Sequence, residues 1–237
     1  RGQAQSGGGA EGMRATNMTH CFCGLGWYFY ADFYRKLYEI AGDKFIISHR
    51  DEAFVQQRKD VHALIRHDLY YRENAGLEWG GYHQFIEMGC YRNYDFVIFL
   101  HDDIVLKNDG FVGELAARFA GNPTLQVIGN GKNGKDWEFR FGKYKDRMFF
   151  EEDDDFVVRT VRGSFFAART SVFQHIENFP VKWKTKTPKK GNISLRNFGY
   201  LISKNFGRES ISYLDEHGWL NTAYIDEMVR GEPAKPV

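Results

Sequence analysis

Residues 94–110 read YDFVIFLHDDIVLKNDG, in which five apolar residues, 96–100, run directly into His101, Asp102 and Asp103. An unbroken apolar run of this kind is typical of a strand that is covered on both faces of its sheet. Two adjacent carboxylates at its end repel each other, and burying them without a counter-ion costs several kcal/mol per charge. A hard divalent cation removes that cost. The stretch alone leaves two interpretations open, a cation site and an exposed turn.

The surrounding sequence predicts alternating strands and helices. Short apolar runs at 18–27, 44–50, 69–76 and 125–131 indicate further strands, and 28–42, 52–68, 80–93 and 110–123 have apolar residues at helical spacing. This order predicts an α/β fold with a doubly wound, mainly parallel sheet.

The second half of the chain has a different character. Trp137, Phe139 and Phe141 alternate as in a strand, 147–170 indicates extended structure around an acidic loop, and 170–180 a short helix with Thr170 as N-cap. Residues 1–17 are rich in glycine and indicate a linker or tag remnant. We therefore expect one domain over 18–237, with an α/β half at 18–131 and an irregular, aromatic-rich half at 132–237, taken from a longer multidomain protein.

Composition restricts the possible partners and location. The 32 Lys and Arg balance 31 Asp and Glu to give a net charge of +1, which provides no electrostatic footprint for nucleic acid. No apolar run approaches the roughly 18–20 residues that span a bilayer, and we identify no signal peptide. Three cysteines, with Cys21 and Cys23 two residues apart, make neither a disulfide framework nor a zinc pair. We expect a cytoplasmic protein.

Polar or glycine-rich residues follow each expected strand of the first half. Ligands of open α/β sheets bind outside the carboxyl ends of the strands. We therefore expect one crevice, lined by the segments 24–26, 48–50, 74–76 and 101–103.

The stretch FLHDDI at 99–104, preceded by NAGLEWGGY at 74–82 and followed by GSFFAART at 163–170, resembles GT-A-fold glycosyltransferases of the family-2 type. The resemblance covers about residues 19–179. It implies transfer of a sugar from a nucleoside-diphosphate sugar to a hydroxyl of a glycan or other acceptor. It also implies that a short acidic motif holds Mn²⁺ or Mg²⁺ and the diphosphate, and that 163–169 lines the acceptor side. On this resemblance, 18–131 is the nucleotide-sugar half and 132–237 the acceptor half.

The resemblance also assigns residues to the site. It makes Asp103 the principal metal ligand, with Asp102 nearer the ribose or a water of the metal, although another register takes Asp102 as the first residue of the motif and Ile104 as its last. His101 stands where an aspartate is common in the family, and CGLGW replaces the usual end of the first strand. The resemblance makes His217 a further candidate metal ligand. The nucleotide-sugar-binding candidates are Gly24, His49, Arg50, Asn74, Gly76, Gly81, His101 and Asp102.

The resemblance implies an inverting transfer, which requires a carboxylate that deprotonates the acceptor hydroxyl. The candidates are Asp215 and Glu216, which lie between Tyr213 and Trp219 and could stand near a stacked sugar ring. The acidic run at 151–155 is more typical of a solvated loop.

Other classes fit the sequence less well. A phosphatase of the haloacid-dehalogenase type carries its acidic motif after the first strand, and a sugar nucleotidyltransferase opens with a glycine-rich basic loop. The alternative that the sequence leaves open is a non-catalytic module that binds a nucleotide sugar or a glycan. Substitution of Asp103 distinguishes the two, because an enzyme loses turnover and a glycan-binding module keeps its affinity.

Overall fold

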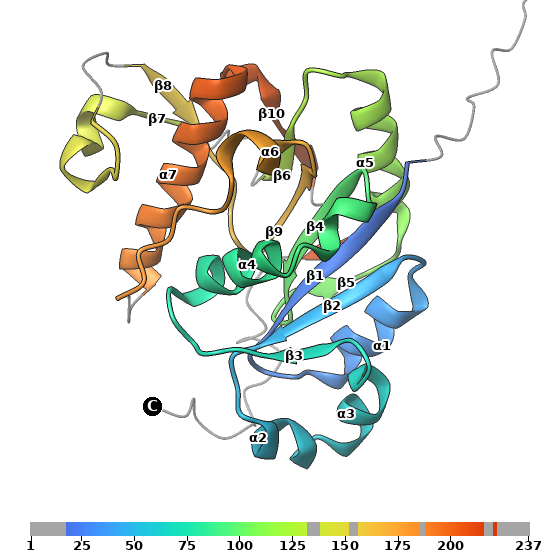
Figure 1. Ribbon diagram of the computed structural model, residues 1–237. Coiled ribbons are helices and arrows are strands. Elements are labelled where there is room, and N and C mark those ends of the chain that lie inside the picture. The colour runs from blue at the N-terminus through green and yellow to red at the C-terminus, as the bar shows by residue number, and fades with distance from the viewer. Residues whose placement is uncertain (1–17, 132–137, 152–155, 185–187, 216–219, 222–237) are drawn as a thin grey trace, which may run out of the picture.

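The computed structural model describes residues 18–131, 138–151, 156–184, 188–215 and 220–221. Its centre is a seven-stranded sheet with the strand order β10-β6-β9-β4-β1-β2-β3 (Figure 1). The strands of this sheet are β1 (His20–Gly26), β2 (Asp43–Ser48), β3 (Leu69–Tyr71), β4 (Phe96–His101), β6 (Val127–Gly131), β9 (Phe165–Arg169) and β10 (Ile211–Asp215). Only β9 is antiparallel to its neighbours, β4 and β6, so the prediction of a mainly parallel sheet is confirmed.

Helices cover both faces of the sheet. One face packs against α1 (Ala31–Glu39), α2 (Glu52–Gln57), α3 (Lys59–Ile65) and α5 (Gly110–Gly121). The other packs against α4 (Leu77–Met88), α6 (Val172–Ile176) and α7 (Pro188–Phe206) (Figure 1). Side chains of β1 alternate accordingly: Phe22 joins the first core, and Cys21 and Cys23 join the second. The doubly wound arrangement is therefore as expected.

Smaller elements complete the chain. Strand β5 (Val105–Leu106) pairs antiparallel with β11 (Leu220–Asn221), and β7 (Glu138–Arg140) with β8 (Val157–Arg159). The 3₁₀ helices are η1 (Cys90–Asn93), η2 (Phe141–Arg147) and η3 (Arg208–Ser210). None of the helices in the described ranges is long and apolar enough to cross a membrane.

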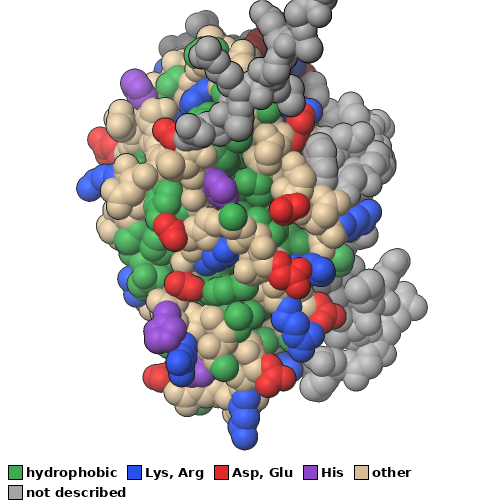
Figure 2. Space-filling model, turned by 90° about the vertical axis from the view of Figure 1, so that its right-hand side faces the viewer, with side chains coloured by type: hydrophobic (Ala, Val, Ile, Leu, Met, Phe, Trp, Pro, Cys, Tyr) green, Lys and Arg blue, Asp and Glu red, His purple; other side chains and the backbone are tan. Residues whose placement is uncertain are grey.

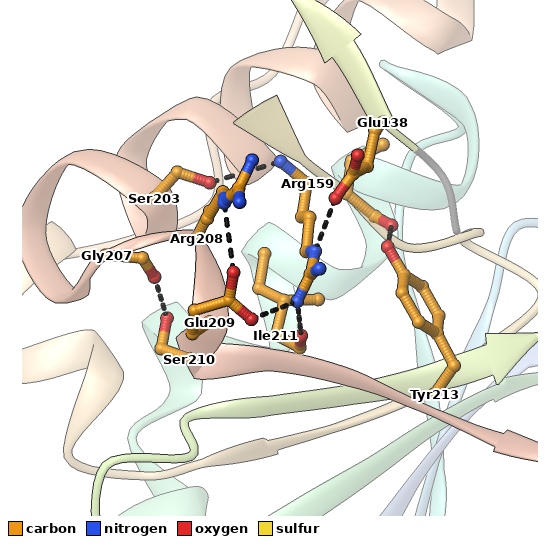
Figure 3. A network of polar contacts seen from close by, with 10 residues as sticks. Glu138, Arg159, Ser203, Gly207, Arg208, Glu209, Ser210, Ile211 and Tyr213 are labelled. Carbon is orange, nitrogen blue, oxygen red and sulfur yellow. Dashed lines mark hydrogen bonds and ion pairs between the residues drawn. The ribbon is translucent and has the colours of Figure 1, made fainter. Parts of the chain in front are cut away.

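A polar network ties the β7–β8 hairpin to the C-terminal part of the sheet (Figure 3). Arg159 donates from Nε to Glu138 Oε1 over 2.6 Å and from Nη1 to Glu209 Oε2 over 2.7 Å. Tyr213 of β10 donates its hydroxyl to the carbonyl of Thr160 over 2.9 Å. Because Arg159 is largely buried, these bonds hold the hairpin, η3 and β10 in one arrangement.

Three local expectations differ from the structure. The helix expected over 52–68 is divided at Arg58, whose φ of −88° and ψ of 61° are not helical. Helix α4, which was expected to begin at Gly80, begins at Leu77, and both Gly76 and Leu77 have a positive φ. Thr170 does not cap α6, because its hydroxyl donates to the carbonyl of Tyr94, and Ser171 occupies the N-cap position.

Charges are mixed on the surface. On the face that Figure 2 shows, basic and acidic side chains are interspersed and do not form a patch of one sign.

Candidate functional site

The topology brings several strand ends to one edge of the sheet. The parallel strands β1, β2, β3 and β4 end there, and the antiparallel β9 begins there. The backbone N–H of His101 donates to the carbonyl of Ser164 over 3.1 Å, which joins the end of β4 to the segment before β9. Strands β6 and β10 end at the same edge. The strand ends that the sequence predicted to meet at one edge of the sheet therefore do so.

Asp102 does not face solvent at this edge. It is 1% exposed, and its Oδ2 accepts hydrogen bonds from the backbone N–H groups of Trp27, Tyr28 and Phe29 at 3.0, 2.9 and 2.6 Å. The Tyr34 hydroxyl donates to the same oxygen over 3.3 Å. Burial raises the pKa of Asp102 to about 7, although the three N–H groups act in the opposite direction. The expectation that Asp102 contacts the ribose or the metal is corrected here, because this carboxylate holds the β1–α1 loop.

The loop that Asp102 organises carries an aromatic–cation stack. The guanidinium of Arg50 lies 4.0 Å from the ring centroid of Trp27 and 4.7 Å from that of Phe54, and its Nε donates to the carbonyl of Trp27 over 3.0 Å. Arg50 follows β2 at the site edge, as expected. Trp27 was not among the residues predicted for this edge, although its position directly after β1 places it there.

Asp103 and His101 lie together at the end of β4. The side chain of Asp103 is 14% exposed, and its Oδ1 is 3.7 Å from Nδ1 of His101. Asp103 Oδ1 and His101 Nε2 are both buried and have no hydrogen-bond partner in the described structure. Buried polar atoms of native proteins are normally paired, so these two are candidate ligand-binding atoms. A carboxylate oxygen and an imidazole nitrogen are also donors that Mn²⁺ accepts.

His49 lies beside this pair. A Cβ built on Gly81 would be 3.1 Å from His49 Nε2 and 2.4 Å from Leu25, so the glycine lets α4 approach the strand ends. His49 Nε2 is buried without a hydrogen-bond partner in the described structure. Burial, with a smaller contribution from His101, lowers the pKa of His49 to about 4. His49 and Gly81 are thus brought together near His101.

The remaining first-half candidates are placed differently. Gly24 lies inside β1, two residues before its end, where an added Cβ would be 2.9 Å from Ile46 Cδ1, so it packs in the core. Asn74 is exposed in the loop before α4. Gly76 is the N-cap of α4 with a φ of 76°, and its N–H donates to the carbonyl of Trp183 over 3.2 Å.

Of the candidate base Asp215, the structure describes only the backbone. Asp215 ends β10 at the site edge, three strands from β4, or about 14 Å at the usual strand spacing. Glu216 and His217 lie outside the described residues. Within the described ranges, no group of three or more His, Cys, Asp or Glu side chains is arranged to hold a metal.

The architecture matches known structures. The mannosyltransferase PcManGT from Pyrobaculum calidifontis, in complex with GDP-Man and Mn²⁺, is similar at a TM-score of 0.51 and 9% identity, over 85% of this chain and 59% of that one. S. aureus TarS is similar at 0.52 and 13%, over 86% of this chain and 60% of the TarS 1–349 chain. The chain has a GT-A-type fold.

A third structure with this fold contains a nucleotide sugar. It is glucosyl-3-phosphoglycerate synthase from Mycobacterium tuberculosis with Mn²⁺, UDP-glucose and phosphoglyceric acid, at a TM-score of 0.51 and 11% identity, over 84% of this chain and 70% of that one. No family model and no curated protein matches the chain. At these identities the likeness establishes the fold, and this chain spans about 60% of the PcManGT and TarS chains.

Proposed function

We propose that this GT-A-fold chain is a glycosyltransferase that moves a sugar from a nucleoside-diphosphate donor to a hydroxyl of a glycan or other acceptor. The observation that carries the proposal is the unpaired Oδ1 of Asp103, buried at the carboxyl edge of the sheet beside the unpaired Nε2 of His101. Ligands of open α/β sheets bind at this edge. Three structures with this fold, two of them crystallised with Mn²⁺ and a nucleotide sugar, support the proposal.

The described side chains at this edge would supply part of the coordination of a divalent cation. Asp103 and His101 would hold it from one side, and the diphosphate of the donor would supply further oxygen ligands. When bound, the cation would neutralise the charge that develops on the leaving diphosphate. Asp102 supports this arrangement indirectly, because it fixes the backbone of 27–29 next to the strand ends.

The nucleoside would lie against the β1–α1 loop. The Trp27–Arg50 stack offers an aromatic face and a cation at the edge, and His49 follows β2 beside it. Cation and aromatic groups of this kind bind a base by stacking and a phosphate by charge. Asn74, Gly76 and Gly81 would border the site through the loop before α4 and its first turns.

The acceptor hydroxyl requires a base on the side opposite the leaving group if the transfer inverts the configuration. We assign this role to Asp215 or Glu216, because β10 ends at the same edge as β4. His217 is retained as a candidate metal ligand. We also propose a cytoplasmic location, which the free thiols of Cys21, Cys23 and Cys90 support.

A calorimetric titration with UDP, GDP and dTDP, each with and without Mn²⁺, tests the proposal. We expect metal-dependent binding of one nucleotide, its loss in Asp103→Ala, and no change in Asp109→Ala, which removes an exposed aspartate six residues away. Release of free sugar from the matching nucleotide sugar would then separate an enzyme from a non-catalytic binding module. If the wild-type protein binds none of the three nucleotides in either condition, the proposal is wrong.

A further inference from the structure

The indole of Trp79 is buried with its N–H unpaired. Trp79 is 0% exposed, and it stacks on Phe166 with ring centroids 5.7 Å apart and contacts the ring of Phe179 edge-on at 5.5 Å. Its Nε1 has no hydrogen-bond partner in the described structure. Buried indole N–H groups usually have a partner, and packing on both sides prevents this ring from turning to find one.

The N–H edge of this indole faces the backbone of Gly163, beside the side chain of Glu78. A Cβ built on Gly163 would lie 3.5 Å from Trp79 Nε1, 3.4 Å from Glu78 Oε1 and 2.8 Å from Glu78 Cγ. The missing side chain at 163 therefore lets one carboxylate oxygen and one indole N–H lie against the same backbone, and an added methyl group would displace Glu78. Tyr82 donates its hydroxyl to the carbonyl of Gly163 over 2.6 Å, which fixes this backbone against α4.

The backbone of Gly163 is next to the proposed diphosphate site. Gly163 precedes Ser164, whose carbonyl accepts the N–H of His101, and the rings of Tyr82 and His101 have centroids 6.1 Å apart. Glu78 and Trp79 lie in the first turn of α4, at the edge where β4 ends. A sugar attached to a diphosphate at Asp103 would thus be within reach of them.

We propose that Glu78 and Trp79 bind one hydroxyl of the sugar carried by the donor. The hydroxyl donates to the Glu78 carboxylate and accepts from the Trp79 indole N–H, which uses both capacities of a hydroxyl group. Glu78 is partly exposed and makes no hydrogen bond or ion pair with another described residue, so its side chain is free to change rotamer and admit the hydroxyl. This inference rests on the proposed function and adds the residues that recognise the sugar.

Calorimetry that compares a nucleotide sugar with its bare nucleotide tests the inference. The pairs are UDP-glucose with UDP, GDP-mannose with GDP and dTDP-glucose with dTDP. For the pair that binds, we expect Glu78→Gln to lower the affinity of the nucleotide sugar about tenfold and to leave that of the nucleotide unchanged, since a charge-assisted bond is lost. Glu87→Gln, at the exposed end of the same helix, is the matched control and should change neither affinity.

Two further measurements make the result independent of turnover. Gly163→Ala should reduce the affinity for the nucleotide sugar alone, whereas Gly113→Ala, where an added Cβ meets nothing within 4 Å, should not. The indole ¹H–¹⁵N resonance of Trp79, assigned with Trp79→Phe, should shift on addition of the nucleotide sugar and not of the nucleotide. Equal affinities in Glu78→Gln and wild type, with an unshifted indole resonance, would overturn this inference and leave the proposed function intact. Failure of the wild type to bind any nucleotide would overturn both.

Discussion

The backbone N–H of Phe29 donates to Oδ2 of Asp102 over 2.6 Å, across 73 positions of the chain. Trp27 and Tyr28 donate to the same oxygen, and Phe29 adopts a φ of 58°, which is uncommon for a residue other than glycine. One carboxylate oxygen therefore satisfies three backbone donors ahead of α1. The N-cap residue Tyr30 makes no side-chain cap bond, so the Asp102 oxygen takes the place of a local cap for this loop.

Two substitutions of Asp102 should separate the contribution of its acceptor oxygen to stability from that of its negative charge. We expect Asp102→Ala to lower the free energy of unfolding by about 3 kcal/mol or more, because it leaves buried N–H groups unpaired. Asp102→Asn keeps an acceptor oxygen, and because burial raises the pKa of Asp102 to about 7, the aspartate itself is partly neutral near that pH. The asparagine variant should therefore lose less stability. Urea unfolding of both variants at pH 7 measures this, and equal losses would contradict it.

The contrast between Asp102 and Asp103 shows what the sequence could predict. The apolar run before them predicted a buried strand that ends in acid, and the order of elements predicted the sheet. Which carboxylate turns inward was not predictable, because it depends on N–H groups 73–75 positions away. The start of α4 was predicted three residues late because Leu77 has a φ of 55°, which no propensity indicates. Glu78 was consequently placed outside the helix and was not among the predicted site residues.

His49 should make stability depend on pH. Burial lowers the pKa of His49 from 6.5 to about 4, so the folded protein binds this proton less tightly than the unfolded chain. The stability from neutral His49 is fully present above about pH 6.5 and is lost as the pH falls through about 4. At pH 5 the loss is about 2 kcal/mol relative to a residue that does not titrate.

The measurement compares wild type with His49→Gln by urea unfolding at pH 7.5 and pH 5. The free energy of unfolding should fall more steeply in wild type, because the glutamine does not titrate. His67→Gln, at an exposed position, should keep the wild-type dependence. A slope that is the same in wild type and His49→Gln would show that His49 does not carry the effect.

Two helical glycines should respond oppositely to alanine. A Cβ on Gly199 of α7 would lie 2.4 Å from the carbonyl oxygen of Arg159 and 2.6 Å from Cβ of Thr160, so the helix and the strand would have to separate. We expect Gly199→Ala to cost about 2 kcal/mol despite its better helix propensity. Gly113→Ala in α5 meets no atom within 4 Å and should stabilise by about 0.5–1 kcal/mol. Thermal unfolding of both variants checks this, and a stabilised Gly199→Ala would show that α7 has room to move.

The buried carboxylate of Asp103 should lower the free energy of unfolding of the ligand-free protein, and ligand binding should reverse this loss. Its Oδ1 is buried without a partner in the described structure, and its charge adds to burial in raising the pKa of Asp102. Asp103→Asn removes this repulsion, so we expect the ligand-free variant to be about 1 kcal/mol more stable than wild type.

Mn²⁺ with the nucleotide that binds should raise the Tm of wild type and not of Asp103→Asn, because only the wild-type carboxylate compensates the added cation. Thermal unfolding with and without these ligands measures both effects. A variant that is less stable than wild type without ligands would indicate that Asp103 is a structural residue like Asp102, and the proposed site would lose its principal carboxylate.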